Sequence, residues 1–312
     1  DTTNSGRVKA QSAARACASL SERVKATVEL DDNAVLWLEE DRDSVRVQAR
    51  RIDVSEVLAR ALFDATSSVI LVSATMTTGG TFKFLRDELG VPTDARELAV
   101  ETPFDFRAQA LLVVPDGFPE PNEPAFAEHA MRALGEVIER AGGRTLGLFT
   151  SYRSLHAAAD ALVGCRYKVY VQGDMGRTEL IARFRAETDS VLLGVDSMWT
   201  GVDVPGESLS VVVIDRLPFP HPEDPLMDAL GASGRSAFFK HMMPRAIMKF
   251  RQGVGRLIRT HGDRGVVVVL DPRIANREYG KQFVRSLPPM LSSRRLDAVS
   301  RFLGEVPDAA AS

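Results

Sequence analysis

The alternation of short apolar runs with amphipathic stretches between residues 110 and 270 restricts the fold more than any other feature of this sequence. Six runs have the composition of buried strands, and they are Ala110–Val114, Arg144–Phe149, Tyr167–Val171, Val191–Leu193, Ser210–Ile214 and Gly265–Leu270. Helical spacing separates several of them, over Glu123–Ala141, Tyr152–Val163 and Arg177–Arg185. Strands that alternate with helices build a parallel sheet covered on both faces. The sequence therefore predicts an α/β fold.

The gross composition is that of a globular protein. The chain has 312 residues, of which 45% are hydrophobic and 26% charged. We find no apolar run long enough to span a membrane and no signal-peptide pattern, so we expect a cytoplasmic protein without a membrane partner. Cys17 and Cys165 match no metal or disulfide spacing, and we predict no metal site. Because the chain opens on Asp1 rather than Met, we expect a fragment.

The region before residue 55 contains few candidate functional residues. Residues 1–30 are polar and rich in alanine, with weak helical spacing. Residues 35–51 predict two short strands around an Asp/Ser turn. Glu39 and Glu40 close an apolar run there and are compatible with a magnesium-binding acidic motif, but a solvated hairpin turn explains them as well.

Residues 55–75 predict a short helix and a strand that end in the tripeptide S-A-T. Ser55 can cap a short helix that ends at Phe63. Val69–Val72 predicts a buried strand, and it runs into Ser73-Ala74-Thr75. Small hydroxyl residues after a strand are ordinary turn chemistry. The S-A-T tripeptide therefore becomes informative only together with other motifs.

The segment from Pro244 to Thr260, PRAIMKFRQGVGRLIRT, predicts an amphipathic helix with an unusual polar face. The polar positions share one side of that helix, and they are Gln252, Gly255, Arg256 and Arg259. An apolar stripe lies opposite, formed by Ile247, Phe250, Val254, Leu257 and Ile258. Gly253 and Gly255 each cost a helix interior about 1 kcal/mol relative to alanine, so we expect a need for bare backbone there. Two arginine forks on one side suit a phosphate, although a solvated basic face is the simpler alternative.

Charge is concentrated around that segment. The net charge is −3, yet the stretch from Arg235 to Arg264 contains eight Lys or Arg residues against one acidic residue, Asp263. The positive charge is therefore local, and the protein is not basic throughout.

Three predicted strand ends hold further candidates, because open α/β sheets bind ligands beyond the carboxyl ends of their strands. Thr150 and Ser151 follow one strand, where they either cap a helix or contact a phosphate. Gln172 follows the next, where a tight turn is the alternative. The third end begins the loop of LLGVDSMWTGVDVPGESLSVVVIDRLPF, which carries Asp196, Thr200, Gly201 and Asp203. A simple connection between two strands would not need a loop of that length.

These motifs together resemble one family. QGVGRLIR is similar to the last motif, Q-x-x-G-R-x-x-R, of superfamily-2 helicases, and the 195–209 loop is similar to their fifth motif. The segments that narrow the match are S-A-T, T-P-F-D-F, D-R-L-P-F, D-R-G and L-D-P-R. Over roughly residues 50–290 the chain resembles the C-terminal part of a DinG/XPD-type DNA helicase.

The resemblance implies an architecture and a set of roles. Residues 1–78 would be a remnant of the first motor domain with its insertion, and residues 79–312 the second RecA-like domain, a parallel sheet with helices on both faces. Arg256, Arg259 and Gln252 would act in catalysis, with Asp203, Gly201 and Gly255 at ATP. Single-stranded DNA would be contacted by Thr150, Ser151, Gln172 and Thr200. Ser73 and Thr75 would couple the phosphate state of the nucleotide to the binding of DNA.

The sequence departs from the family in what it lacks. It contains no G-x-x-x-x-G-K-[S/T] phosphate-binding loop, so most of the binding site for ATP and Mg²⁺ is missing. The Asp-Glu-Ala-His box and the four cysteines that hold an iron–sulfur cluster are also absent from the sequence. In the family all of these precede S-A-T. We therefore expect the first motor domain, with any cluster, to lie upstream or on another chain.

The expected activity is that of an ATP-dependent DNA helicase, 5′-to-3′ by resemblance, in DNA repair or replication. This chain alone would be inactive. Two alternatives stay open at this stage: a stand-alone nucleic-acid-binding module that does not use ATP, and the helicase half of a nuclease-helicase fusion.

Overall fold

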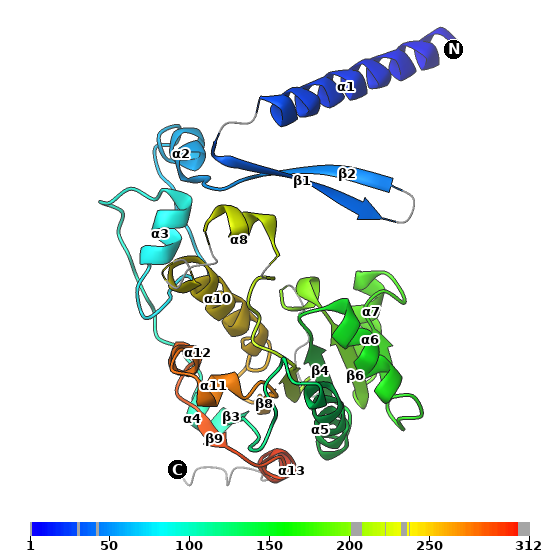
Figure 1. The fold of residues 1–312 in the computed structure, drawn as a ribbon, viewed down its shortest axis with the longest axis vertical. Coiled ribbons are helices and arrows are strands. Elements are labelled where there is room, and N and C mark those ends of the chain that lie inside the picture. Colours follow the sequence, from blue (N-terminus) through cyan, green and yellow to red (C-terminus); the bar gives the residue numbers. More distant parts are fainter. Residues whose placement is uncertain are drawn as a thin grey trace. The chain divides into compact units, whose positions relative to one another are not determined.

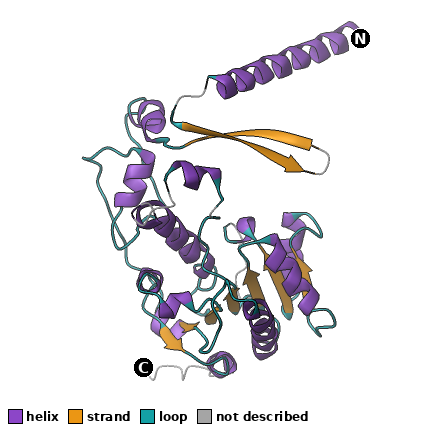
Figure 2. Ribbon diagram, viewed as in Figure 1, coloured by secondary structure: helices purple, strands orange, loops and turns teal. Residues whose placement is uncertain are grey.

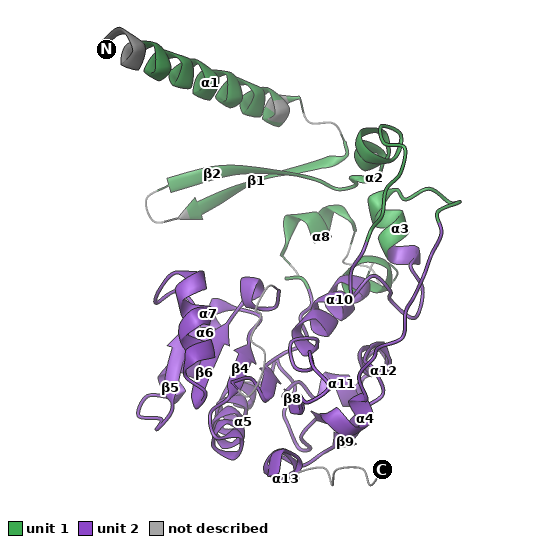
Figure 3. Cartoon of the chain, turned by 180° about the vertical axis from the view of Figure 1, so that it is seen from behind, with its two compact units in different colours: residues 1–71, 85–95, 220–242 green, residues 72–84, 96–219, 243–312 purple. Residues whose placement is uncertain are grey.

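The computed structural model describes residues 2–29, 32–41, 44–200, 208–221, 223–231, 236 and 238–304. The chain forms two compact units that interleave along the sequence (Figure 3). The first unit contains residues 1–71, 85–95 and 220–242, and the second contains residues 72–84, 96–219 and 243–312. Gly79, the expected start of the second motor domain, therefore lies inside the second unit.

The second unit is built on a seven-stranded parallel sheet (Figure 1). Its strands in chain order are β3 (Ala110–Val113), β4 (Thr145–Leu148), β5 (Lys168–Val171), β6 (Ser190–Gly194), β7 (Val211–Ile214), β8 (Gly265–Val269) and β9 (Leu291–Ser293). They lie side by side in the order β5-β6-β4-β7-β8-β3-β9. The six strands predicted from composition are confirmed, with no end shifted by more than one residue.

The second unit also contains eight helices among its described residues. They are α4 (Phe106–Gln109), α5 (Ala125–Ala141), α6 (Tyr152–Ala161), α7 (Arg177–Ala186), α10 (Met243–Val254), α11 (Arg273–Asn276), α12 (Gly280–Ser286) and α13 (Ala298–Gly304), with the short turn η2 at Asp196–Met198. The three predicted helices before residue 186 are confirmed as α5, α6 and α7.

The two faces of the sheet are covered by different helices. β7 and β8 are buried along their whole length, which explains their runs of valine. On one face, alternate strand residues such as Val213 and Val268 form a core with apolar side chains of α5, α6 and α13. Leu148 of β4 does not belong to that core and instead lies next to Gly253 of α10. The predicted cover on both faces is therefore confirmed.

The first unit contains the predicted hairpin. β1 (Ala34–Asp41) and β2 (Ser44–Arg51) are antiparallel and follow the long helix α1 (Thr2–Val28), as Figure 2 shows. The unit also contains α2 (Ser55–Leu58), η1 (Ala59–Phe63), α8 (Pro225–Ala229), η3 (Phe238–Met242) and most of α3 (Lys83–Leu89). Ser55 does not cap α2: it lies within the helix, and its backbone N–H donates to Asp53 Oδ1 at 2.7 Å.

Two predictions about strands are wrong. Residues 69–72 form no strand, and Ile70 and Val72 are 84% and 87% exposed. A strand needs a neighbour for its N–H and C=O groups, and no strand in the described part of the chain pairs with this run. Conversely, β9 was not predicted, because three residues at a sheet edge leave no apolar pattern in the sequence.

Candidate functional site

The predicted nucleic-acid-binding residues follow the carboxyl ends of three neighbouring strands of the sheet. β5, β6 and β4 are neighbours, and all strands of the sheet are parallel. Thr150 and Ser151 follow β4, Gln172 follows β5, and Thr200 comes six residues after β6. The carboxyl ends of these strands therefore gather side chains that are up to 50 residues apart in sequence.

Ser151 is the N-cap of α6. Its hydroxyl accepts from the Ser154 N–H at 3.2 Å and lies 2.8 Å from the Ser154 hydroxyl. Thr150, one residue earlier, is half-buried. Ser151 therefore caps the helix, which was one of the two alternatives. A phosphate contact at the same place stays a prediction.

Gln172 holds the loop after β6 to its neighbours. Its Oε1 accepts from the Val195 N–H at 2.8 Å. Its Nε2 donates to the hydroxyls of Tyr152 and Ser197, at 3.3 Å each. The side chain therefore bridges the end of β5, the start of α6 and the loop after β6, a role that the sequence did not suggest.

Four further contacts fix that loop. Trp199 is fully buried, and its indole N–H donates to the Phe149 carbonyl at 2.9 Å. Arg177 Nη2 donates to the carbonyls of Ser197 at 3.3 Å and Thr200 at 3.0 Å. On the helix side, Lys249 pairs with Asp196 at 2.7 Å. Thr200 itself is exposed, and Gly201 and Asp203 lie outside the described residues.

The predicted arginine helix is shorter than expected. α10 ends at Val254, so Arg256 and Arg259 lie on the turn that follows rather than on one helical face. The turn brings Leu257 onto Gly265, at the start of β8, where any side chain would collide with it. The predicted apolar stripe is nevertheless buried throughout.

Backbone contacts hold both arginines on this turn. Arg256 Nε donates to the Gln252 carbonyl at 3.0 Å, and Arg259 Nε donates to the Arg256 carbonyl at 3.4 Å. Asp263 closes the turn by accepting from the N–H groups of Arg259 and Thr260, at 2.8 Å each. The two guanidinium groups are therefore oriented by the chain itself.

Close packing explains why residue 253 is a glycine. A Cβ atom there would lie 2.9 Å from Leu148 Cδ1 and 3.0 Å from Trp199 Cε3, both in buried side chains. At Gly255 a Cβ would lie 3.1 Å from the Arg251 carbonyl oxygen and 3.8 Å from that of Gln252, both in the preceding turn of the chain. Gly253 thus lets α10 lie close to the sheet and to the loop after β6. Gly255 lies just beyond the helix end and has no comparable packing reason.

The S-A-T segment lies against α10. Arg251 donates to the carbonyl and hydroxyl of Thr77, the latter at 3.2 Å, and to the Ala74 carbonyl at 3.4 Å. Gln252 donates to the Thr75 hydroxyl at 3.5 Å. The Thr75 N–H in turn donates to the Ser73 hydroxyl at 3.2 Å. Arg251 was not singled out by sequence, because a basic residue on a polar helix face looks like a solvated one.

Two buried carboxylates follow the central strands. Asp271, after β8, accepts from the Leu217 N–H at 2.8 Å and from the Arg273 guanidinium. It therefore ties the L-D-P-R segment to the D-R-L-P-F segment. Asp215, after β7, accepts from the Arg216 N–H at 2.7 Å through Oδ1, while its Oδ2 has no hydrogen-bond partner within the part of the chain that the structure describes.

Burial raises the pKa of Asp215 to about 7, although Arg216 and Ser154 oppose the shift. The unfolded carboxyl ionises near pH 4, whereas the folded one keeps its proton up to about pH 7. Its contribution to stability is therefore present at low pH and lost as the pH rises from about 4 to 7. We predict that Asp215→Asn raises the free energy of unfolding by about 4 kcal/mol at pH 8 and hardly changes it at pH 4, because about three pKa units correspond to that amount.

Urea unfolding at the two pH values measures this difference. Asp116→Asn is a suitable control, since Asp116 forms an exposed ion pair with Arg294. A gain for Asp215→Asn that is equal at pH 4 and pH 8 would contradict the raised pKa.

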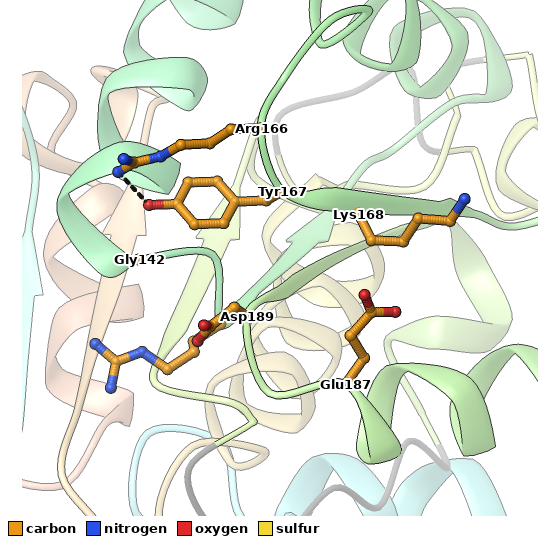
Figure 4. A pocket seen from close by; sticks show the side chains of 7 residues that line it. Gly142, Arg166, Tyr167, Lys168, Glu187 and Asp189 are labelled. Carbon is orange, nitrogen blue, oxygen red and sulfur yellow. Dashed lines mark hydrogen bonds between the residues drawn. The ribbon is translucent and has the colours of Figure 1, made fainter.

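A pocket of ≈ 550 Å³ lies at the opposite ends of the same strands (Figure 4). Arg166, Tyr167, Lys168, Glu187 and Asp189 line it together with Gly142 and Arg144. Arg166 already pairs with Glu139 at 2.7 Å and donates to the Tyr167 hydroxyl. Since charges of both signs line it and no predicted site residue reaches it, the candidate site lies elsewhere, at the carboxyl edge.

No group of three His, Cys, Asp or Glu side chains that could hold a metal ion occurs among the described residues. Cys17 is exposed and Cys165 is half-buried, and neither forms a disulfide. A search of the described helices found none that is long and apolar enough to cross a membrane.

Comparisons with known proteins agree with this geometry. Residues 134–290 match the family described as the helicase C-terminal domain. The chain is 40% identical over 271 residues to the ATP-dependent helicase DinG of Mycobacterium tuberculosis, a match that covers 83% of this chain and 41% of that protein. It is 31% identical over 286 residues to the 3′-5′ exonuclease DinG of Bacillus subtilis, covering 86% of this chain and 31% of that protein.

A solved XPD helicase has the same fold. The match has a TM-score of 0.60 and 19% identity, and it covers 79% of this chain and 46% of that one. The predicted RecA-like sheet is therefore confirmed. The chain spans about two fifths of the length of the DinG helicase that it matches.

Proposed function

Because the chain belongs to the helicase C-terminal domain family, we propose that it is the second motor domain of a DinG-type ATP-dependent DNA helicase. The observation that carries the proposal is the turn after α10, where two arginines are oriented by their own backbone contacts. The similarity to a DinG helicase over 83% of this chain supports the same assignment. Residues 1–78 would then be the remnant of the first motor domain, and residues 79–312 the second.

The nucleotide side of the site would be shared with the first motor domain. Arg256 and Arg259 would stabilise charge on the phosphates, since planar guanidinium groups suit phosphate oxygens. Gln252 would position water or phosphate, Gly255 would give the turn room beside the nucleotide, and Gly201 and Asp203 would face ATP. When bound, Mg²⁺-ATP would supply the phosphoryl group that is transferred to water. Mg²⁺ would be held by the first domain, which would also carry any iron–sulfur cluster.

The nucleic-acid-binding surface would lie at the carboxyl ends of β4, β5 and β6. Thr150, Ser151, Gln172 and Thr200 would contact the backbone of single-stranded DNA, and Ser73 and Thr75 would couple that contact to the nucleotide. Hydroxyls, amides and helix N-termini are groups that bind phosphates without reading bases. The same resemblance would imply a role in DNA repair or replication and 5′-to-3′ movement, while the cytoplasmic location is the expectation from the apolar pattern of the sequence.

This assignment of faces is tested by a salt titration of DNA binding. Only half of the groove would be on this chain, so we predict weak binding with two or three phosphate contacts. Each phosphate neutralised by a Lys or Arg side chain adds roughly 0.7 to the slope of log affinity against log salt for single strands, and since the four named side chains are neutral we expect a shallow slope. Thr200→Ala should weaken binding, and Arg259→Ala should leave it nearly unchanged. Fluorescence anisotropy with a labelled single strand at several salt concentrations measures both.

The reverse outcome would mean that the nucleotide face and the DNA face have been exchanged. Oligonucleotides of different base sequence are a necessary control, since backbone contacts predict equal affinities.

One alternative keeps a specific observation in its favour. The similarity to the 3′-5′ exonuclease DinG of Bacillus subtilis covers only 31% of that protein. This chain would then be the helicase half of a nuclease-helicase fusion, with the nuclease on the remainder. An acidic exonuclease motif in the adjoining sequence would support the fusion. The stand-alone binding module, by contrast, predicts that ATP never changes the affinity for DNA.

A further inference from the structure

We propose that Arg251 is a positioning residue that fastens the Ser73–Thr77 segment to α10, so that the S-A-T motif and the two arginines move as one body. The inference rests on the proposed function, because it assigns the contact a part in ATP-driven movement. It goes beyond that function by naming the residue that passes a displacement at the phosphates to the S-A-T segment. In the proposed division into motor domains, this contact joins the end of the first domain to the second.

The geometry of the contact is that of a clamp. Arg251 Nη1 donates to both the carbonyl and the hydroxyl of Thr77, and Nη2 donates to the Ala74 carbonyl. The two acceptor residues lie on either side of Thr75, which Gln252 reaches from the next position of the chain. A planar fork with fixed donors holds two backbone points at once, whereas an ammonium group would hold one.

The partners of Arg251 are neutral, which distinguishes it from an ordinary surface cation. Among the described residues no carboxylate lies within ion-pair distance of its guanidinium, and burial lowers the pKa of Arg251. A half-buried cation without a counter-ion remains in place because its donors are satisfied by backbone carbonyls. Its charge also adds to the positive potential that Arg256 and Arg259 present on the turn after α10.

Arg251 makes three hydrogen bonds between α10 and residues 72–84, while Gln252 adds one and Arg245 lies over the Phe84 ring at 5.6 Å. Residues 72–84 belong to the second unit, coloured with α10 in Figure 3, although residues 1–71 and 85–95 do not. Thr78 and Thr81 exchange backbone hydrogen bonds at 3.0 and 3.2 Å, which makes a small local turn. Ser73 is exposed and Thr75 half-buried. Without Arg251, we expect this segment to leave α10 readily.

Hydrogen exchange in the 312-residue chain tests the contact without any assumption about function. We expect Arg251→Gln to speed amide exchange in the peptide spanning residues 72–81 about tenfold, with the sheet unchanged. Arg251→Lys should give a smaller effect, because it keeps the charge but carries all its donors on one nitrogen in place of Nη1 and Nη2. Arg301→Ala is the matched control, since Arg301 forms only an exposed pair with Asp297 at 3.3 Å. Unchanged exchange in Arg251→Gln would overturn the inference and leave the proposed function standing.

ATP turnover of the chain joined to its first motor domain tests the coupling. We expect Arg251→Gln to reduce the stimulation of kcat by single-stranded DNA about tenfold while KM for ATP changes less than twofold, with partial rescue by Arg251→Lys. A merely structural role would instead lower stability and alter both constants together. Normal DNA stimulation in Arg251→Gln, despite faster exchange, would overturn the coupling role. An absence of DNA-stimulated turnover in the unmodified protein would overturn the proposed function and the coupling with it.

Discussion

Arg256→Ala should reduce ATP turnover of the chain joined to its first motor domain by about 10³-fold or more, the effect measured for arginine fingers in related phosphoryl-transfer systems. The reason is that a preoriented guanidinium stabilises charge that develops on the phosphate oxygens in the transition state. Arg256 is preoriented here by the bond from its Nε to the Gln252 carbonyl at 3.0 Å. Steady-state phosphate release with single-stranded DNA present measures the effect.

Arg256→Lys is the informative second variant. Lysine keeps the charge but loses both the planar fork and the Nε donor, so we expect turnover nearly as low as in Arg256→Ala. Arg140→Ala serves as the control, because Arg140 forms a partly exposed i,i+4 pair with Glu136 at 2.8 Å. If the lysine variant kept most of the turnover, Arg256 would act as a point charge or in packing.

The second large effect concerns stability. Trp199→Ala should lower the free energy of unfolding by about 3–5 kcal/mol, the range for removing a buried tryptophan or phenylalanine. Trp199 is fully buried beneath Gly253 of α10, and its indole N–H reaches the Phe149 carbonyl at 2.9 Å. The substitution would leave both a cavity and an unpaired carbonyl next to Thr150. Urea unfolding followed by circular dichroism measures the loss.

Two companion variants sharpen this test. Tyr152→Ala removes an aromatic ring that is 53% exposed, so it should cost less than about 1 kcal/mol. Trp199→Phe keeps most of the apolar volume but not the N–H donor, and we expect an intermediate loss. A loss for Trp199→Ala no larger than that for Tyr152→Ala would mean that the loop after β6 is not anchored by its tryptophan.

The sheet was the most predictable part of the molecule, because its chemistry is local. Strands such as Val211–Ile214 are buried on both faces and consist of β-branched residues, which leaves an unmistakable run in the sequence. Val69–Val72 is just as apolar, with Leu71 as its one residue that is not β-branched, and yet forms no strand. Whether such a run becomes a strand depends on a neighbour, and composition carries no information about the neighbour.

The candidate site was predictable in its residues but not in their contacts. The motif order identified Arg256, Arg259 and Gln252, whereas the end of α10 at Val254 and the contact of Leu257 with Gly265 left no signal in the sequence. Arg177 and Arg251 act through distant backbone carbonyls, and no spacing rule connects a side chain with a carbonyl more than 20 residues away. These contacts became visible only in three dimensions.

The central claim is that this chain supplies one half of an ATPase site, and ATP turnover tests it most directly. We compare the 312-residue chain alone with the chain joined to its first motor domain, both with single-stranded DNA. The account predicts no DNA-stimulated turnover by the chain alone, and turnover that depends on Arg256 and Arg259 once the domains are joined. Turnover by the chain alone, above that of an Arg256→Ala/Arg259→Ala double variant, would contradict it.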